Sequence, residues 1–219
     1  IGVRGLMGSR TDEILRRPLP LALLWAAAVA GVALLVGRYW IALDDGTLAQ
    51  SAERVLGGQL PHRDFGDPYS GLNAMLGAAA FKAFGVRLAS LRVPLVAGFA
   101  LWLPAVWLLA RRHLPPTASL AATVLATTLS VLAYPAAMPT WFGLFAVTWG
   151  AWMLSKGLDE GGRAWLAGAG AMAGVAVLFK VVGLYFLAAS LLALAWNRVD
   201  GGRVYAALVA GCTAAFLLL

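Results

Sequence analysis

The first apolar run of the chain, residues 19–40, reads LPLALLWAAAVAGVALLVGRYW. A helix needs about 20 apolar residues to cross the hydrocarbon core of a bilayer, where it satisfies its own backbone hydrogen bonds. The run has that length, so we predict a membrane-spanning helix at this position. The rest of the sequence is also apolar enough to form membrane-spanning helices.

The composition excludes an ordinary soluble domain. Hydrophobic residues make up 61% of the 219 residues and charged residues 12%, against about 45–50% and about 25% in soluble domains. We therefore predict an all-α integral membrane protein. The net charge of +7 comes from basic residues scattered between apolar runs. Multi-pass proteins keep cytoplasmic anchors at such positions, so we predict no nucleic-acid partner.

Seven apolar runs are predicted to span the membrane and to form one module, residues 19–219. They are Leu19–Tyr39, Arg92–Ala110, Thr117–Tyr134, Thr140–Ser155, Ala164–Phe179, Val182–Trp196 and Val204–Leu219. The runs at 140–155, 164–179 and 182–196 are shorter than the usual span of about 20 residues, so their helices must extend a few residues further. The last run stops without a polar flank, which predicts a chain cut short within a longer protein.

The basic residues predict the orientation of the chain in the membrane. Arg10, Arg16 and Arg17 precede the first run and place residues 1–18 in the cytoplasm under the positive-inside rule. With seven spans, the short basic loops fall on the same side; these loops are residues 111–113, 156–163 and 197–203. The long polar segment, residues 41–90, then lies on the outer face.

This orientation requires that residues 69–84 do not span the membrane. The run is rich in Gly and Ala and is interrupted by Asn73 and Lys82, so we predict an interfacial or re-entrant helix. A second interfacial helix is predicted after Asp45, because the apolar and polar side chains of residues 46–56 separate onto two faces.

Five of the ten acidic residues gather in the outer segment. They are Asp44, Asp45, Glu53, Asp64 and Asp67. The adjacent pair beyond the first span has three interpretations: a cap for the following helix, a site for a hard cation, or a general base. The residues by themselves leave all three open.

The order of residues in this segment resembles the first outer loop of GT-C membrane glycosyltransferases. The resemblance lies in Ala42-Leu43-Asp44-Asp45-Gly46, in Leu56-Gly57-Gly58 after an alanine-rich helix, and in Pro61-His62-Arg63-Asp64-Phe65. The loop is similar to a bacterial branch related to protein O-mannosyltransferases and to the lipid A aminoarabinose transferase. Members of that branch typically carry an Asp-Glu pair, a Tyr four residues beyond the Asp, and a Pro-Tyr-x-Asp-Phe stretch.

The resemblance implies that Asp44 is the general base and that the donor is lipid-linked. Asp44 corresponds to the essential Asp of the family, Asp45 stands where the family has Glu, and Leu48 stands where it has Tyr. The donor would be a sugar on polyprenyl phosphate, transferred with inversion to a lipid, glycan or protein acceptor on the outer face. The same resemblance implies a location in the bacterial inner membrane.

A lipid phosphate as the leaving group requires cationic side chains at the outer end of the helices. Lys180 lies between two apolar runs at that end. A lysine at the membrane boundary is costly and is often functional, although it can also snorkel to the interface. Further candidates are Arg63 and Arg92 for the phosphate, with His62, Asp64 and Asp67 in supporting roles.

Two departures from the family pattern concern the metal and the acceptor. Many members carry a second acid in the next outer loop, whereas residues 134–140 here contain none. The lipid A branch has a Lys two residues past the Phe of the loop, where this chain has Asp67. The participation of a divalent cation, Mg²⁺ or Mn²⁺, and a lipid A substrate are therefore both open. The alternative function is a non-enzymatic membrane protein, either a transporter or a scaffold that binds a lipid carrier.

Overall fold

The computed structural model describes residues 18–197 and 202–217. Within these ranges the chain forms nine α-helices, one short 3₁₀-helix and no strand, which confirms the predicted all-α class. The arginines that predict a cytoplasmic N-terminus and the last two residues of the chain lie outside the described residues.

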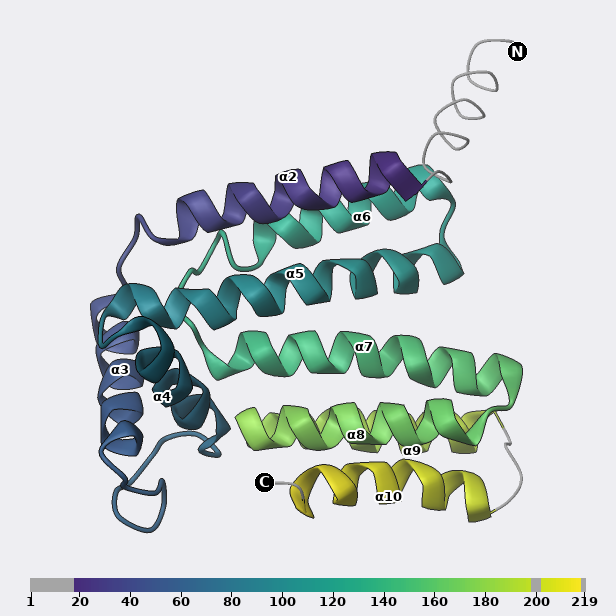
Figure 1. The fold of residues 1–219 in the computed structure, drawn as a ribbon. Coiled ribbons are helices and arrows are strands. Elements are labelled where there is room, and N and C mark those ends of the chain that lie inside the picture. The colour runs from purple at the N-terminus through teal and green to yellow at the C-terminus, as the bar shows by residue number, and fades with distance from the viewer. Residues whose placement is uncertain (1–17, 198–201, 218–219) are drawn as a thin grey trace.

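Seven of the described helices run side by side as a bundle (Figure 1). They are α2 (Pro18–Val36), α5 (Leu88–His113), α6 (Pro116–Leu129), α7 (Pro139–Glu160), α8 (Arg163–Phe179), α9 (Leu184–Trp196) and α10 (Gly202–Leu217). Each coincides with one predicted span. Helices α2 and α5 are long and apolar enough to cross a bilayer, with mean hydropathies of 2.4 and 2.0. Helices α6, α8 and α9 are apolar but shorter.

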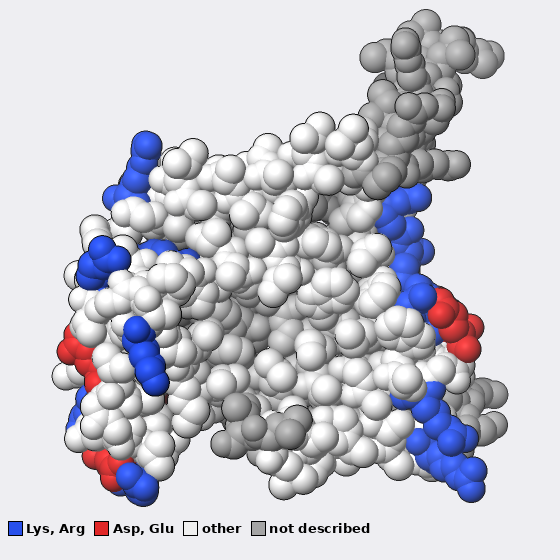
Figure 2. Space-filling model, viewed as in Figure 1, with Lys and Arg blue, Asp and Glu red and all other residues white. Residues whose placement is uncertain are grey.

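Helices α3 (Ala42–Leu56) and α4 (Leu72–Phe84) lie across one end of the bundle (Figure 1). Residues 69–84 therefore do not run alongside the predicted spans, as the sequence indicates. Helix α4 contacts α3 closely at Gly77, where an added Cβ would lie 2.8 Å from the Cβ of Ala52. Charged side chains gather at the two ends of the bundle and leave the middle of the visible face uncharged (Figure 2). That pattern fits an apolar belt between two polar boundaries.

Helix α6 ends at Leu129, five residues before the predicted boundary. Residues 130–134 form a turn in which the N–H groups of Ala133 and Tyr134 donate to the carbonyl of Ser130. Ser130, with φ −103° and ψ −117°, already departs from the helix, and Pro135 disfavours the helical conformation for Tyr134, the residue before it. Tyr134 therefore lies at the end of the bundle and not inside a span.

Helix α5 continues through two prolines, and one of them is compensated from α2. Pro104 has no N–H, so the carbonyl of Ala100 lacks its usual partner in the helix. The indole N–H of Trp25 in α2 donates to this carbonyl at 2.8 Å. An unpaired carbonyl in hydrocarbon costs several kcal/mol, so this bond both satisfies α5 and joins it to α2.

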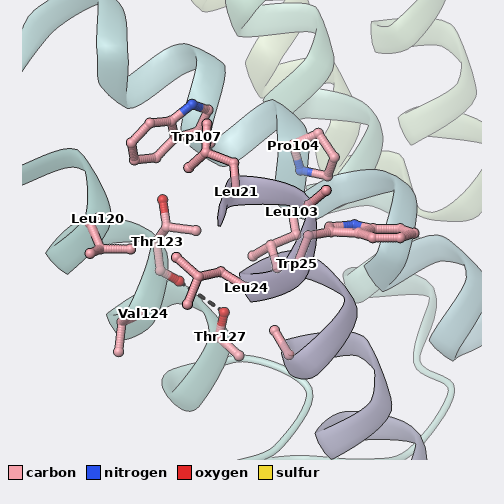
Figure 3. A pocket seen from close by; sticks show the side chains of 12 residues that line it. Leu21, Leu24, Trp25, Leu103, Pro104, Trp107, Leu120, Thr123, Val124 and Thr127 are labelled. Atoms are coloured by element: carbon pink, nitrogen blue, oxygen red, sulfur yellow. Dashed lines mark hydrogen bonds between the residues drawn. The ribbon is translucent and has the colours of Figure 1, made fainter. Parts of the chain in front are cut away.

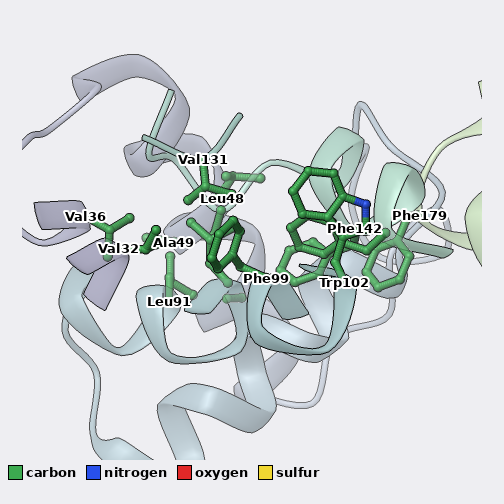
Figure 4. Close-up of a cluster of buried hydrophobic side chains, with 14 of the residues drawn as sticks. Val32, Val36, Leu48, Ala49, Leu91, Phe99, Trp102, Val131, Phe142 and Phe179 are labelled. Carbon is green, nitrogen blue, oxygen red and sulfur yellow. The ribbon is translucent and has the colours of Figure 1, made fainter. Parts of the chain in front are cut away.

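A buried apolar cluster connects the bundle to α3 (Figure 4). Its members include Val32, Val36, Leu48, Ala49, Leu91, Phe99, Trp102, Val131, Phe142 and Phe179. The rings of Phe142 and Phe179 stack with their centroids 5.0 Å apart. Leu48 and Ala49 follow the acidic pair of α3 by one helical turn. The cluster therefore fixes the part of α3 that carries the acids.

We expect Trp25→Phe to destabilise the protein by about 1–3 kcal/mol, because the Ala100 carbonyl would lose its donor in apolar surroundings. In a Pro104→Ala background the N–H at position 104 returns, and the same change should cost less than about 1 kcal/mol. Thermal unfolding of the detergent-solubilised protein measures both losses. Equal losses in the two backgrounds would show that the hydrogen bond from Trp25 to Ala100 does not contribute to stability.

Candidate active site at one end of the bundle

Asp44 and Asp45 lie within the first turn of α3, whereas the sequence predicted a helix that begins after Asp45, with a cap as one of three interpretations of the acidic pair. The helix begins at Ala42, and Ile41 is the N-cap residue without a side-chain cap. The Oδ2 atom of Asp45 accepts the N–H of Ile41 at 2.9 Å. The carboxylate thus satisfies one of the N–H groups that the start of a helix leaves unpaired, and it does so from inside the helix.

The carboxylate of Asp45 also forms a buried ion pair with Arg92 of α5. Oδ2 of Asp45 lies 2.7 Å from Nη2 of Arg92, and the two side chains are 2% and 7% exposed. The same Nη2 donates to the carbonyl of Tyr39 at 3.3 Å, while Nη1 has no partner within the described residues. Arg92 was predicted to bind phosphate. In the structure it links α5 to α3 through Asp45 and to the end of the first predicted span through Tyr39.

The carboxylate of Asp44 is held by a hydroxyl from a distant segment. The Tyr134 hydroxyl donates a short hydrogen bond to Oδ2 of Asp44. This hydrogen bond is the main reason why the pKa of Tyr134 is raised, with smaller contributions from burial and from the charges of Asp44 and Asp45. Asp44 itself is half-buried. The bond connects α3 to the turn that follows α6.

Tyr69 lies close to both Asp44 and Lys180. Burial raises the pKa of Tyr69, as do the negative charges of Asp44 and Asp67. Oδ1 of Asp67 accepts the N–H of Tyr69 at 2.8 Å. Nζ of Lys180 lies 5.8 Å from the centroid of the Tyr69 ring and 3.4 Å from Oγ1 of Thr140. An acid, three hydroxyl groups and a cation from separate segments therefore gather at this end.

Lys180 occupies a break between two helices, as the sequence predicts. Its backbone is extended, with φ −159° and ψ 135°, between α8 and the 3₁₀-helix Val181–Gly183. No carboxylate pairs with its ammonium group in the part of the chain that the structure describes. The charge is therefore available to an anionic ligand.

Three predicted site residues lie apart from this cluster. His62, Arg63 and Asp64 belong to a tight turn, in which the N–H of His62 donates to the carbonyl of Phe65 at 2.8 Å. The guanidinium of Arg54 lies 4.5 Å from the centroid of the Phe65 ring, which places the turn beside the last turn of α3. Arg54 is ten residues beyond Asp44, or about 15 Å along the helix axis.

The charged side chains of Arg63 and Asp64 in this turn pair with each other. Nη2 of Arg63 lies 2.7 Å from Oδ2 of Asp64 in an exposed ion pair. The hydrogen bond from Arg63 is the main cause that lowers the pKa of Asp64 to about 2, and a bond from the N–H of Leu60 adds to it. His62 is exposed and has a positive φ of 64°. None of the three contributes a contact to Asp44 or Lys180.

The geometry of the acidic pair bears on the predicted divalent cation. A site made by Asp44 and Asp45 together does not fit the folded chain, because Oδ2 of Asp45 is already bound to Arg92 and Ile41. In the described residues no group of three His, Cys, Asp or Glu side chains could hold a metal ion. The divalent cation stays a prediction.

The hydroxyl groups near Asp44 were not predicted from the sequence. Residues 134–140 contain no acid, and the signal that was available there is Tyr134. The other available signal was Leu48, which stands where the resembled family has a Tyr. Leu48 is buried in the apolar cluster, and the hydroxyl that reaches Asp44 comes from Tyr134 instead.

A family model described as dolichyl-phosphate-mannose-protein mannosyltransferase matches residues 72–219, more than half of the chain. The chain belongs to this family. Membership confirms the predicted GT-C resemblance and supports a membrane-integral glycosyltransferase that uses a lipid-linked sugar donor. The bacterial branch stays a prediction. No match was found among curated proteins or among solved structures.

The matched range contains only part of the candidate site. Arg92, Tyr134 and Lys180 lie within it, whereas Asp44 and Asp45 lie before its first residue. The family match therefore supports the class of reaction, and the roles of the two acids rest on the geometry and on the resemblance of the first loop.

Removing one partner of the Asp45–Arg92 pair should destabilise the protein by roughly 3–5 kcal/mol, because the other charge would stay buried and unpaired. We expect Asp45→Asn and Arg92→Gln each to lower the melting temperature in detergent. The double variant should lose less than the sum of the two, since neither charge remains.

Arg63→Gln is the matched control, because its exposed ion pair should contribute less than about 1 kcal/mol. Additive losses in the Asp45–Arg92 double variant would show that the two side chains do not act as a pair.

Proposed function

We propose that the chain transfers a sugar from a polyprenyl-phosphate donor to an acceptor on the outer face of the membrane, with Asp44 as the general base. Family membership supports the lipid-linked donor. The observation that carries the assignment of the site is the placement of the Asp44 carboxylate, held by Tyr134, at the same end of the bundle as Tyr69 and the unpaired Lys180.

The proposed reaction is an in-line displacement at the anomeric carbon of the donor. The acceptor oxygen or nitrogen forms a bond to that carbon while Asp44 takes its proton. The bond between the anomeric carbon and the phosphate oxygen breaks, and its electron pair leaves with the polyprenyl phosphate, so the configuration inverts. A general base must lie within hydrogen-bond reach of the proton it removes. Oδ2 of Asp44 is bound to Tyr134, so the other carboxylate oxygen is the one proposed to accept the proton.

Lys180 is proposed to stabilise the leaving phosphate. Negative charge develops on the phosphate oxygen as the bond to the sugar breaks, and a fixed cation next to it lowers the barrier. Tyr69 and Thr140 lie beside the ammonium group and restrict its position.

The remaining residues are proposed to position these two groups. Arg92 and Asp45 hold the first turn of α3 on α5, so that Asp44 keeps its orientation. Asp67 orients Tyr69 through its backbone N–H. The turn that contains Arg63 and Asp64 supplies no group to the reaction in this proposal, because it lies at the other end of α3.

Asp44→Asn should reduce sugar transfer by about 10²–10⁴-fold, since the amide cannot accept the proton of the acceptor. The measurement is transfer from a lipid-linked donor in membranes that contain the full-length protein. Glu53→Gln is the matched control, because Glu53 is an exposed acid on the same helix and its loss should leave transfer unchanged. Full activity of Asp44→Asn would show that Asp44 is not the general base, whereas no transfer by the unmodified protein would favour a non-enzymatic role in binding the lipid carrier.

Lys180→Gln should lower kcat/KM for the donor by roughly 10–100-fold, the equivalent of a charge-assisted hydrogen bond of about 1.5–3 kcal/mol to the leaving phosphate. Lys180→Arg should recover part of the loss, because it restores the charge. Lys82→Gln, at an exposed position in the last turn of α4, is the matched control. A loss of transfer in Lys180→Gln that comes with a lower melting temperature and is not recovered in Lys180→Arg would assign Lys180 a structural role.

A further inference from the structure

A cavity of about 370 Å³ lies between α2, α5 and α6 (Figure 3). Among the residues that line it are Leu24 and Trp25 of α2, Trp107 of α5 and Thr123 of α6. Trp107 is fifteen residues beyond Arg92 on α5, or about 22 Å along the helix axis. The cavity therefore lies toward the end of the bundle opposite Asp44 and is separate from the candidate active site.

Of the four polar side chains in the wall of this cavity, those of Trp25, Thr123 and Thr127 are already paired. The indole N–H of Trp25 donates to Ala100. The hydroxyl of Thr123 donates to the carbonyl of Ser119 at 2.8 Å, and that of Thr127 donates to the carbonyl of Thr123 at 2.9 Å (Figure 3). A buried water needs two to four polar partners, and this wall has few to offer. Leu24, Trp25 and Val124 of this wall are exposed, so the cavity opens to the surface, and its apolar wall favours an apolar occupant.

The surroundings of the cavity indicate which kind of apolar group occupies it. Helix α2 is an apolar candidate span with most of its surface uncovered, so the medium on that side is the hydrocarbon of the bilayer. Acyl chains are the apolar groups that the bilayer presents there. The occupant is therefore expected to be a lipid chain.

A cation lies where the headgroup of such a lipid would be. Arg111 follows Trp107 by one helical turn, and its Cζ atom lies 5.9 Å from the centroid of the Trp107 ring. A tryptophan and an arginine at the end of a span are typical of the headgroup level. Arg112 pairs with Asp159, whereas no carboxylate pairs with Arg111 within the described residues.

We propose that this cavity binds one acyl chain of an anionic phospholipid from the leaflet opposite the candidate active site, with its phosphate at Arg111. The site is independent of the proposed glycosyl transfer. The polyprenyl chain of the donor is the competing occupant, but its phosphate belongs near Lys180, at the other end of the bundle. A phospholipid of the near leaflet reaches the cavity without crossing the bilayer.

The experiment uses the full-length protein in phosphatidylethanolamine vesicles with added phosphatidylglycerol whose acyl chain carries a photoactivatable diazirine. After irradiation, mass spectrometry of peptides should find the label on residues 103–107 and 120–127. Thr123→Phe fills the cavity and should reduce this labelling several-fold. Thr128→Phe is the matched control: Thr128 also donates to carbonyls of its own helix, is exposed and does not line the cavity.

A second variant tests the headgroup contact. Arg111→Gln should reduce labelling by the phosphatidylglycerol probe about fivefold, the equivalent of about 1 kcal/mol for one cation at an anionic headgroup. Labelling by a phosphatidylcholine probe with the same chain should not change. Two results would overturn the proposal: labelling spread evenly over the lipid-facing helices, or labelling that unlabelled polyprenyl phosphate displaces and phosphatidylglycerol does not.

Discussion

The buried ion pair between Asp45 and Arg92 fixes the position of α3 on the bundle. Because α3 lies across the end of the bundle, it shares no long parallel contact with the spans; beyond its first turns it packs on α4, where Ala52 meets Gly77. The pair acts there together with the apolar side chains of Leu48 and Ala49. Asp44 is thus carried by a helix whose start is held by charge and by packing, and sites on such elements are more precise than sites on loops.

The sequence was sufficient to predict the all-α class, the approximate ranges of the helices and the break at Lys180. These features depend on local properties: apolar length, the spacing of prolines and glycines, and the side on which basic residues gather. The partners within the site could not be predicted in this way. Arg92 and Asp45 are 47 residues apart, and Tyr134 and Asp44 are 90 residues apart. Contacts at such separations depend on how helices pack and where each one ends, which no local pattern contains.

In this site, the hydroxyl group at Asp44 comes from a different segment than the family pattern indicates. The resembled glycosyltransferases carry a Tyr on the same helix as the acid, one turn further along. Here that position is Leu48, which packs in the core, and the hydroxyl at Asp44 comes from the turn after α6. Transferring roles by alignment alone would have missed Tyr134. Because α6 ends at Leu129, the turn that follows it can bring the hydroxyl of Tyr134 to Asp44.

The shortness of α6 has a consequence for the shape of the membrane around the site. Its 14 residues measure about 21 Å, whereas the hydrocarbon core of a bilayer is about 30 Å thick. As a span, α6 is therefore roughly 9 Å shorter than the hydrocarbon core, and the bilayer beside it must thin or the bundle must tilt. Thinning would bring the headgroups of that leaflet toward the turn that carries Tyr134. In the proposed reaction, a lipid-linked phosphate would then reach Asp44 without leaving its own leaflet.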